Sequence, residues 1–108
     1  MIELIKHIEI LLLDNDCVIV PGLGGFIAHH QPSRYEEDER VFLPPTRTVG
    51  FNPQLTMNDG LLTQAYMQTY HTDFPDASRK IALKVQELKE MLYSEGVVEM
   101  PGIGSLHY

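Results

Sequence analysis

The sequence predicts an α+β fold in which helices pack on short antiparallel β-hairpins, with two related halves in tandem. Two observations lead to this prediction. Apolar residues recur at helical spacing in two stretches, and each stretch is followed by two short apolar runs that a Pro-Gly-apolar-Gly turn separates. The two patterns also align with each other without a gap. A length of 108 residues suits one small compact unit.

The charge balance limits the kind of partner that the chain can bind. There are 8 Lys and Arg residues against 15 Asp and Glu residues, which gives a formal net charge of -7. Neutralisation of phosphates by basic side chains supplies most of the non-specific affinity of proteins for nucleic acid. A histone-like protein that grips DNA through its whole surface is therefore excluded.

The single cysteine and the apolar N-terminus indicate whether the chain is secreted, membrane-spanning or soluble. Cys17 has no second cysteine, so no disulfide can form within the chain, and its place beside Asp16 at the head of an apolar run predicts a buried, inert thiol. Residues 1–13 lack the basic region and cleavage site of a signal peptide. Their longest apolar run, 10–13, is far short of the ~20 residues that cross a bilayer. We expect a soluble segment.

The first helix is expected over residues 1–13. Its apolar positions at helical spacing are Ile2, Ile5, Ile8, Leu11 and Leu12. Leu4, Ile10 and Leu13 add a second apolar side, so we expect the helix to be mostly buried. The turn-forming cluster at residues 14–16 ends it.

Strand patterns follow this helix. Residues 17–20 and 26–28 predict two short strands around a tight turn. The polar residues 29–40 lack a helical period and form either a loop or an extended arm. Strand character resumes at residues 41–43 and 46–51, and the Asn-Pro pair that ends in Pro53 closes this part of the chain.

Two helices and a second hairpin complete the chain. Residues 56–59 have the Ser/Thr-x-x-acid pattern of a helix start. Asp73 is a candidate N-cap for a longer helix that Gly96 ends. The apolar positions of this longer helix are Ile81, Val85, Leu88 and Leu92. Residues 97–100 and 105–108 predict strands on either side of another tight turn.

An internal repeat relates the two hairpins and the helices before them. An offset of 80 residues sets Pro21 over Pro101, and the same register extends back through about four helical turns, with Leu12 over Leu92. The turn residues expected to be structural are Pro21, Gly22, Gly24, Pro53, Pro101, Gly102 and Gly104. We predict a duplication with halves at residues 1–56 and 57–108; two unrelated hairpins are the alternative. The second copy is either degenerate or cut short, and we expect the latter because its last strand would otherwise lack a partner.

The order of these elements resembles the superfamily of HU and integration host factor. The matching residues are Val18–Phe26 for the first hairpin and Phe51–Pro53 before the next helix. The resemblance implies two HU-like units in tandem that form one compact, pseudo-dimeric unit with equivalent helical core stripes. HU proteins dimerise through their helices and hold DNA in the minor groove with two β-arms.

A narrower resemblance concerns a tandem prokaryotic HU branch that precedes SPOR domains in membrane proteins. Residues 17–26, 51–53 and 58–62 carry it. It implies a module on the cytoplasmic side of the inner membrane, within a longer membrane-anchored protein linked to cell division. Peptidoglycan would be contacted only through a downstream SPOR domain.

The arm of this sequence differs from that of DNA-binding relatives, in which the corresponding segment is rich in Arg and Lys and carries an N-P-x-T-G tip. Two arginines stand against four consecutive carboxylates here, a net charge of -2 with His neutral, and these carboxylates would repel phosphates. A solvated tip and an acidic contact for a basic partner both remain open. The residues of this possible partner surface are Arg34, Tyr35, Glu36, Glu37, Asp38, Glu39 and Arg40.

No pattern in the sequence predicts catalysis, a metal or a cofactor. Gly22–Gly25 follows a strand, but no third glycine occupies position 27 and no Lys-Ser/Thr follows, so neither nucleotide-binding loop is indicated. His29 and His30 point to opposite faces of a strand and lack companion ligands.

We therefore predict a non-catalytic HU-like binding or scaffolding module of a bacterial cell-envelope or cell-division protein, which contacts a protein partner or associates with itself. The alternative is weak, non-sequence-specific DNA binding that tethers the chromosome to the envelope. Its candidate contacts are Arg79, Lys80 and Lys84 at the start of the long helix, a cluster that solubility alone would also explain.

Overall fold

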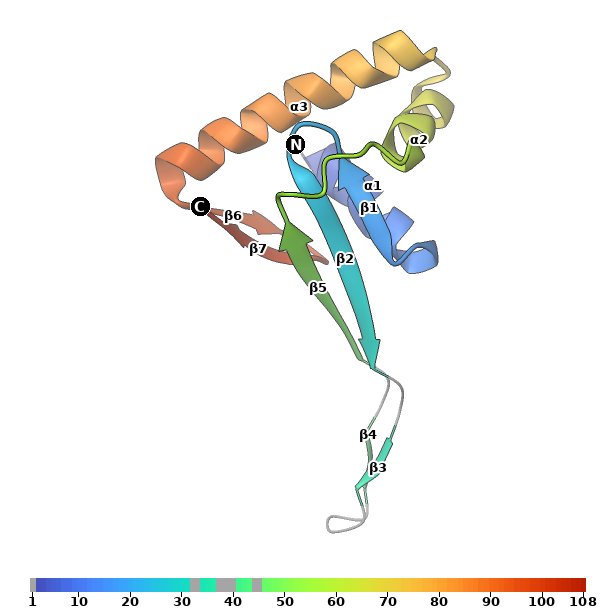
Figure 1. Cartoon of the computed structure of the whole chain (residues 1–108), viewed down its shortest axis with the longest axis vertical. Coiled ribbons are helices and arrows are strands. Elements are labelled where there is room, and N and C mark those ends of the chain that lie inside the picture. The colour runs from blue at the N-terminus through green and yellow to red at the C-terminus, as the bar shows by residue number, and fades with distance from the viewer. Residues whose placement is uncertain (1, 32–33, 37–40, 44–45) are drawn as a thin grey trace.

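The computed structural model describes residues 2–31, 34–36, 41–43 and 46–108 (Figure 1). Helices and short antiparallel strands alternate along the chain, which confirms the predicted α+β class. The elements in order are α1 (Ile2–Asp14), β1 (Cys17–Val20), β2 (Gly24–Gln31), β3 (Arg34–Glu36), β4 (Val41–Leu43), β5 (Thr46–Asn52), α2 (Leu61–Tyr70), α3 (Phe74–Glu95), β6 (Val97–Met100) and β7 (Gly104–His107).

In the described part of the chain, the strands form one sheet in the order β1-β2-β5 and two two-stranded sheets, β3-β4 and β6-β7. The β2-β5 ladder runs from the Gly25–Asn52 pair to the Gln31–Thr46 pair. Figure 1 shows that the paired strands β2 and β5 extend away from the helices and that β3 and β4 lie at the far end of this pair. Of the two alternatives for this segment, the described residues form an extended arm.

The two hairpins share one register. Val18 pairs with Phe26 in the first hairpin, and Val98 pairs with Leu106 in the second, which are the positions 80 residues further on. All four side chains are buried. The register predicted from the offset is therefore present in the structure, pair by pair.

The two turns are also alike. In the first, the N–H of Leu23 donates to the carbonyl of Val20 (3.0 Å), and in the second the N–H of Ile103 donates to that of Met100 (2.9 Å). Their leading glycines, Gly22 and Gly102, have φ angles of 82° and 82°. A positive φ favours glycine because other side chains clash with the backbone there.

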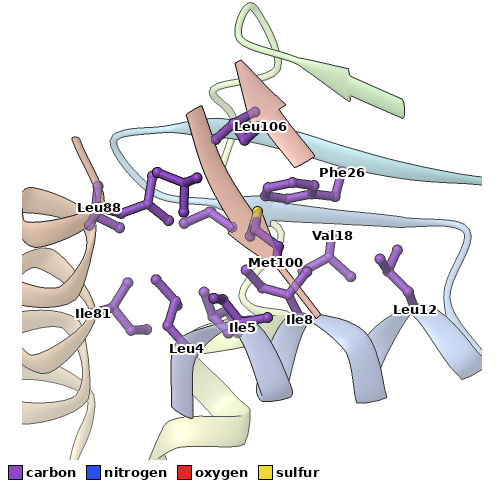
Figure 2. Packing of buried hydrophobic residues seen from close by; sticks show 14 of the residues in the cluster. Leu4, Ile5, Ile8, Leu12, Val18, Phe26, Ile81, Leu88, Met100 and Leu106 are labelled. Atoms are coloured by element: carbon purple, nitrogen blue, oxygen red, sulfur yellow. The ribbon is translucent and has the colours of Figure 1, made fainter. Parts of the chain in front are cut away.

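One hydrophobic core is shared by both repeats. Figure 2 shows side chains of α1, α3 and both hairpins converging on it. The α1 contribution is Leu4, Ile5, Ile8 and Leu12, and the α3 contribution is Ala77, Ile81, Val85, Leu88 and Leu92. The predicted stripes are thus confirmed for these residues except Leu4, which was expected on the second side of α1, and Ala77, which was not expected. Leu11 is partly buried, and the side chain of Ile2 lies outside the described part. The helices are covered by one another and by the hairpins, as in a pseudo-dimer.

Each turn also packs on the helix of the other repeat. Pro101 lines a cavity with Ile5, Lys6 and Glu9 of α1, and the Glu9 carboxylate lies against Gly102. A β-carbon built on Gly22 would lie 3.8 Å from Cγ1 of Val85 in α3. This reciprocal packing ties α1 to the second hairpin and α3 to the first.

The expectation that α1 is mostly buried on two sides is wrong for its outer side. Ile10 is 51% exposed and Leu13 is 67% exposed. Only one side of α1 faces the core because the hairpins and α2 approach it from that side. A wide apolar pattern was therefore a poor guide to the extent of burial.

The expected helix start at residues 56–59 is also wrong. Helix α2 begins at Leu61, after Gly60 in the left-handed conformation (φ 79°), and Gly60 supplies no side-chain cap. The Asp59 carboxylate instead accepts hydrogen bonds from the N–H groups of Leu61 (3.1 Å) and Ile19 (3.2 Å). By contrast, the expected cap of α3 is confirmed, since Asp73 accepts from the N–H of Asp76.

A matched pair of glycine substitutions tests the difference between the repeats. A β-carbon at Gly24 would lie 2.7 Å from Phe51 and 2.8 Å from the carbonyl oxygen of Asn52, whereas nothing lies within 4 Å of one at Gly104. Both glycines have positive φ, which costs an alanine about 1–3 kcal/mol. We expect Gly24→Ala to cost about 1–3 kcal/mol more than Gly104→Ala through overpacking. Urea unfolding measures both, and equal losses would show that the β5 contact is absent in solution.

Candidate interaction surfaces

The basic cluster of α3 is paired with carboxylates of the same helix. The Arg79 guanidinium forms an ion pair with Asp76, and the ammonium of Lys80 lies 3.5 Å from the other carboxylate oxygen of Asp76. The ammonium of Lys84 lies 3.7 Å from Glu87. The structure therefore brings the three predicted cations together, but each has an acidic neighbour one helical turn away.

Asp76 is the centre of this arrangement. The hydroxyl of Thr72 donates to its carboxylate (2.7 Å). That bond, followed by the one from Arg79, lowers the pKa of Asp76 from 3.8 to about 2. Asp76 is consequently ionised across the physiological pH range and opposes the approach of another anion.

The predicted arm surface is described only in part. Arg34, Tyr35 and Glu36 form β3, and their backbone pairs with β4. Residues 37–40, which hold the other three carboxylates and Arg40, lie outside the described residues. The acidic run thus begins at the last residue of β3, Glu36, and ends two residues before β4 begins at Val41.

Sequence reasoning missed Arg47 on β5. One terminal nitrogen of its guanidinium donates to the carbonyl of Gly102 in the second turn (3.3 Å), and the other is buried without a hydrogen-bond partner. Arg47 therefore joins the base of the arm to the second hairpin. An isolated Arg between two threonines gives no signal of such a contact in sequence.

A polar joint connects α1, α2 and α3. The hydroxyl of Tyr70 donates to the carboxylate of Glu3, which lowers the pKa of Glu3 and raises that of Tyr70. Tyr66 is buried beside them against the ring of His7 (4.6 Å between ring centroids), and burial raises its pKa to about 12. The cavity at this joint, of about 280 Å³, is lined by Glu3, Tyr66, Tyr70, Lys80, Leu83, Lys84 and Glu87. Two lysines and two glutamates balance its charge.

The expectation of a fully buried thiol is wrong, because the side chain of Cys17 is only partly buried. Desolvation by this partial burial is the main reason that the pKa of its thiol is raised, and the second cause is the carboxylate of Asp59, which is 42 residues away in sequence. Its thiolate is disfavoured, as expected for an inert thiol.

A second cavity, of about 480 Å³, lies where the end of β7 meets the end of α3 and the first turn. Tyr93 and Tyr108 meet edge to face there, with their ring centroids 5.0 Å apart, and are 62% and 81% exposed. The lining residues are Gly22, Leu23, Phe51, Pro53, Lys89, Leu92, Tyr93, His107 and Tyr108. We call this cavity the β7 groove. Its lining comes from distant parts of the sequence, so no local pattern predicted it.

Within residues 2–31, 34–36, 41–43 and 46–108, no group of three or more His, Cys, Asp or Glu side chains could hold a metal ion. None of the helices described by the structure is both long and apolar enough to cross a membrane.

The shared core, the paired hairpins and the arm define a protein of tandem HU-like domains, which are a non-catalytic fold family. Residues 1–59 match the family model of the CCDC81-like prokaryotic HU domain 1, and residues 60–108 match that of the CCDC81-like prokaryotic HU domain 2. The chain therefore belongs to the CCDC81-like prokaryotic HU family. No curated protein and no solved structure matches it.

A pH titration tests the environment of Asp76. Its folded-state pKa, about 2, is below the ordinary 3.8, so its contribution to stability is complete above pH 3.8 and is lost as pH falls through 2. We expect Thr72→Val to raise the pKa of Asp76 because it removes the largest cause of the shift. Carboxyl-carbon NMR measures this pKa. An unchanged pKa in the variant would contradict the Thr72 contact, and Thr56→Val is the control.

Proposed function

We propose that this tandem HU pair is a non-catalytic module for protein binding and assembly, and not a DNA-gripping one. The observation that carries the proposal is the pairing of every cation of the α3 cluster with a carboxylate, Asp76 or Glu87. DNA laid on this face would bring phosphates close to both carboxylates. Repulsion from these carboxylates offsets the release of counterions on which non-specific affinity depends.

The acidic arm supports the same proposal. Its four consecutive carboxylates stand at residues 36–39, and the first of them, Glu36, ends β3, which lies at the far end of the β2-β5 ladder (Figure 1). We propose that this run, with Arg34, Tyr35 and Arg40, contacts a basic surface of a partner protein. Charge complementarity would accelerate and orient such an encounter.

We also propose that the pair works on the cytoplasmic face of the inner membrane, as part of a longer membrane-anchored protein associated with cell division. The resemblance of residues 17–26, 51–53 and 58–62 to HU pairs that precede SPOR domains supports this placement. Any contact with peptidoglycan would be made by a SPOR domain and not by these residues. The division of the chain into functional halves at residues 56 and 57 belongs to the same proposal.

Weak, shape-dependent DNA binding is the second candidate. The extended arm favours it, because β-arms of this kind hold DNA in HU proteins. Arg79, Lys80 and Lys84 would be its contacts on the helical body. Under this alternative the module tethers the chromosome to the envelope.

DNA binding separates the two candidates. We expect a labelled DNA duplex to show no saturable anisotropy change with the protein at 150 mM KCl, up to roughly 100 µM, the weak end of non-specific affinities. The variant Asp76→Asn/Glu87→Gln lacks both carboxylates. Because these carboxylates repel phosphates, we expect this variant to bind DNA detectably. Asp14→Asn/Glu95→Gln makes the same change of net charge elsewhere and is the control.

Saturable DNA binding by the unmodified protein below roughly 100 µM would overturn the proposed function. If the affinity for DNA fell at least tenfold in Arg79→Ala/Lys80→Ala/Lys84→Ala, the DNA-tethering candidate would replace the proposed function. The folded state of each variant is checked by circular dichroism before the titration.

A further inference from the structure

The cavity at the polar joint has the size and the lining of a site for a small ligand. It lies between Glu3 of α1, Tyr66 and Tyr70 of α2 and residues 80–87 of α3, and we call it the joint cavity. Its volume of about 280 Å³ is just below the range of about 300–1,000 Å³ that is typical of small-molecule sites. Charged, hydroxyl and apolar groups all line it. A small ligand with both polar and apolar parts therefore suits it.

Tyr66 brings to this cavity a hydroxyl group without a hydrogen-bond partner. The residue is 2% exposed, and its hydroxyl oxygen is buried and unpartnered among the described residues. Burying a hydroxyl without a hydrogen bond is unfavourable. Burial is also the main reason that its pKa is raised to about 12, so the hydroxyl stays protonated and can donate or accept a hydrogen bond. A ligand that bonds to this hydroxyl would remove the unfavourable term.

The charges of the joint cavity lie next to one another in opposite pairs. The ammonium of Lys84 lies 3.7 Å from the carboxylate of Glu87. The pKa of Glu3 is lowered first by the hydrogen bond from Tyr70 and then by the charge of Lys84. Lys84 is thus within electrostatic reach of two carboxylates, one on α1 and one on α3. A ligand complementary to this arrangement carries a positive and a negative group close together.

Both lysines of the cavity can bind a further acceptor. The ion pairs of Lys80 and Lys84, at 3.5 Å and 3.7 Å, are longer than a close charge-assisted hydrogen bond, which measures about 2.7–2.9 Å. Each ammonium group has three N–H donors. A carboxylate of the ligand can therefore accept hydrogen bonds from these lysines while the acids of the cavity attract its positive group.

The apolar part of the lining selects the body of the ligand. The rings of Tyr66 and Tyr70 are tilted by 42°, with their centroids 5.5 Å apart. Leu83, which also lines the cavity, is 59% exposed. Contact with an apolar or aromatic group would remove part of this surface from water. The ligand therefore carries an apolar group beside its two charges.

We propose that the joint cavity binds a free α-amino acid with an apolar side chain. Its ammonium group bonds to the carboxylate of Glu3 and the hydroxyl of Tyr66. Its carboxylate accepts hydrogen bonds from Lys80 and Lys84, and its side chain packs on the apolar part of the lining. A residue within a peptide does not fit, because amide bonds consume both of these charges. The charge balance that opposes a phosphate chain favours this zwitterion, since each of its charges meets an opposite one.

This binding site lies beyond the proposed function and does not depend on it. L-Phenylalanine is the probe, because its ring can pack on those of the tyrosines. We expect saturable binding to the whole chain by isothermal titration calorimetry, with a dissociation constant below roughly 1 mM. Phenethylamine lacks the carboxylate and hydrocinnamate lacks the ammonium group, so each should bind at least tenfold more weakly. Absence of saturable binding of L-phenylalanine, or equal binding of either analogue, would overturn the inference.

Matched variants test the two polar ends of the site. Lys84→Gln should weaken binding of L-phenylalanine at least tenfold, whereas Lys89→Gln makes the same change of charge on α3 outside the cavity and should leave binding unchanged. Tyr66→Phe should weaken binding and raise the urea midpoint of the free protein, because it removes an unpartnered buried hydroxyl. Tyr93→Phe, at an exposed ring, should change neither. A lower midpoint for Tyr66→Phe would show that the hydroxyl has a partner in the free protein and would count against the site.

Amide NMR shifts of the unmodified protein locate the site and need no variant to fold. On addition of L-phenylalanine, the amides of Tyr70, Leu83 and Lys84 should shift along one saturation curve, and that of His107 in the β7 groove should not. Shifts confined to the β7 groove would contradict the assignment. The proposed function fails on the DNA titration instead, so the two failures are distinguishable.

Discussion

The structure depends on the burial of two helical stripes that neither repeat can cover alone. Helices α1 and α3 both face one core, and the turn of each hairpin packs on the helix of the other repeat. Burying an aliphatic side chain stabilises a fold by about 1.5–3 kcal/mol, so exposure of either stripe would exceed the margin of a small domain. The same constraint explains why the two hairpins keep one register, since their buried pairs fill equivalent places in the core.

The repeats differ in the segments that lie outside the shared core. Strand β5 covers the edge of β2, approaches Gly24 closely and continues into the arm, whereas β7 ends beside an open groove lined by exposed tyrosines. The three cations of the α3 cluster each form an ion pair with an acid of the same helix. The two repeats therefore share one interior and differ at the edges of their sheets and in the acidic arm.

Much of the fold could be predicted from sequence because it rests on local patterns. Helical spacing identified the buried residues of α3 except Ala77, and the 80-residue offset gave the register of the second hairpin. Contacts between distant segments could not be predicted in this way. Asp59 bonds to Ile19 across 40 residues, and Leu13 is exposed because none of the elements that the structure describes covers its side of α1. The β7 groove was missed for the same reason, whereas spacings of 3 and 4 on α3 could have revealed the pairing of Arg79 and Lys80 with Asp76.

Native-state hydrogen exchange of an Ile5→Ala variant tests the shared core most directly. Ile5 belongs to α1, while the amide of Val98 lies in β6 of the second repeat. If the repeats form one cooperative unit, the substitution lowers the opening free energy of Val98 as much as that of Val18 in the first repeat, by about 2–5 kcal/mol. Loss of protection at Val18 with Val98 unchanged would show two independent halves and contradict the account.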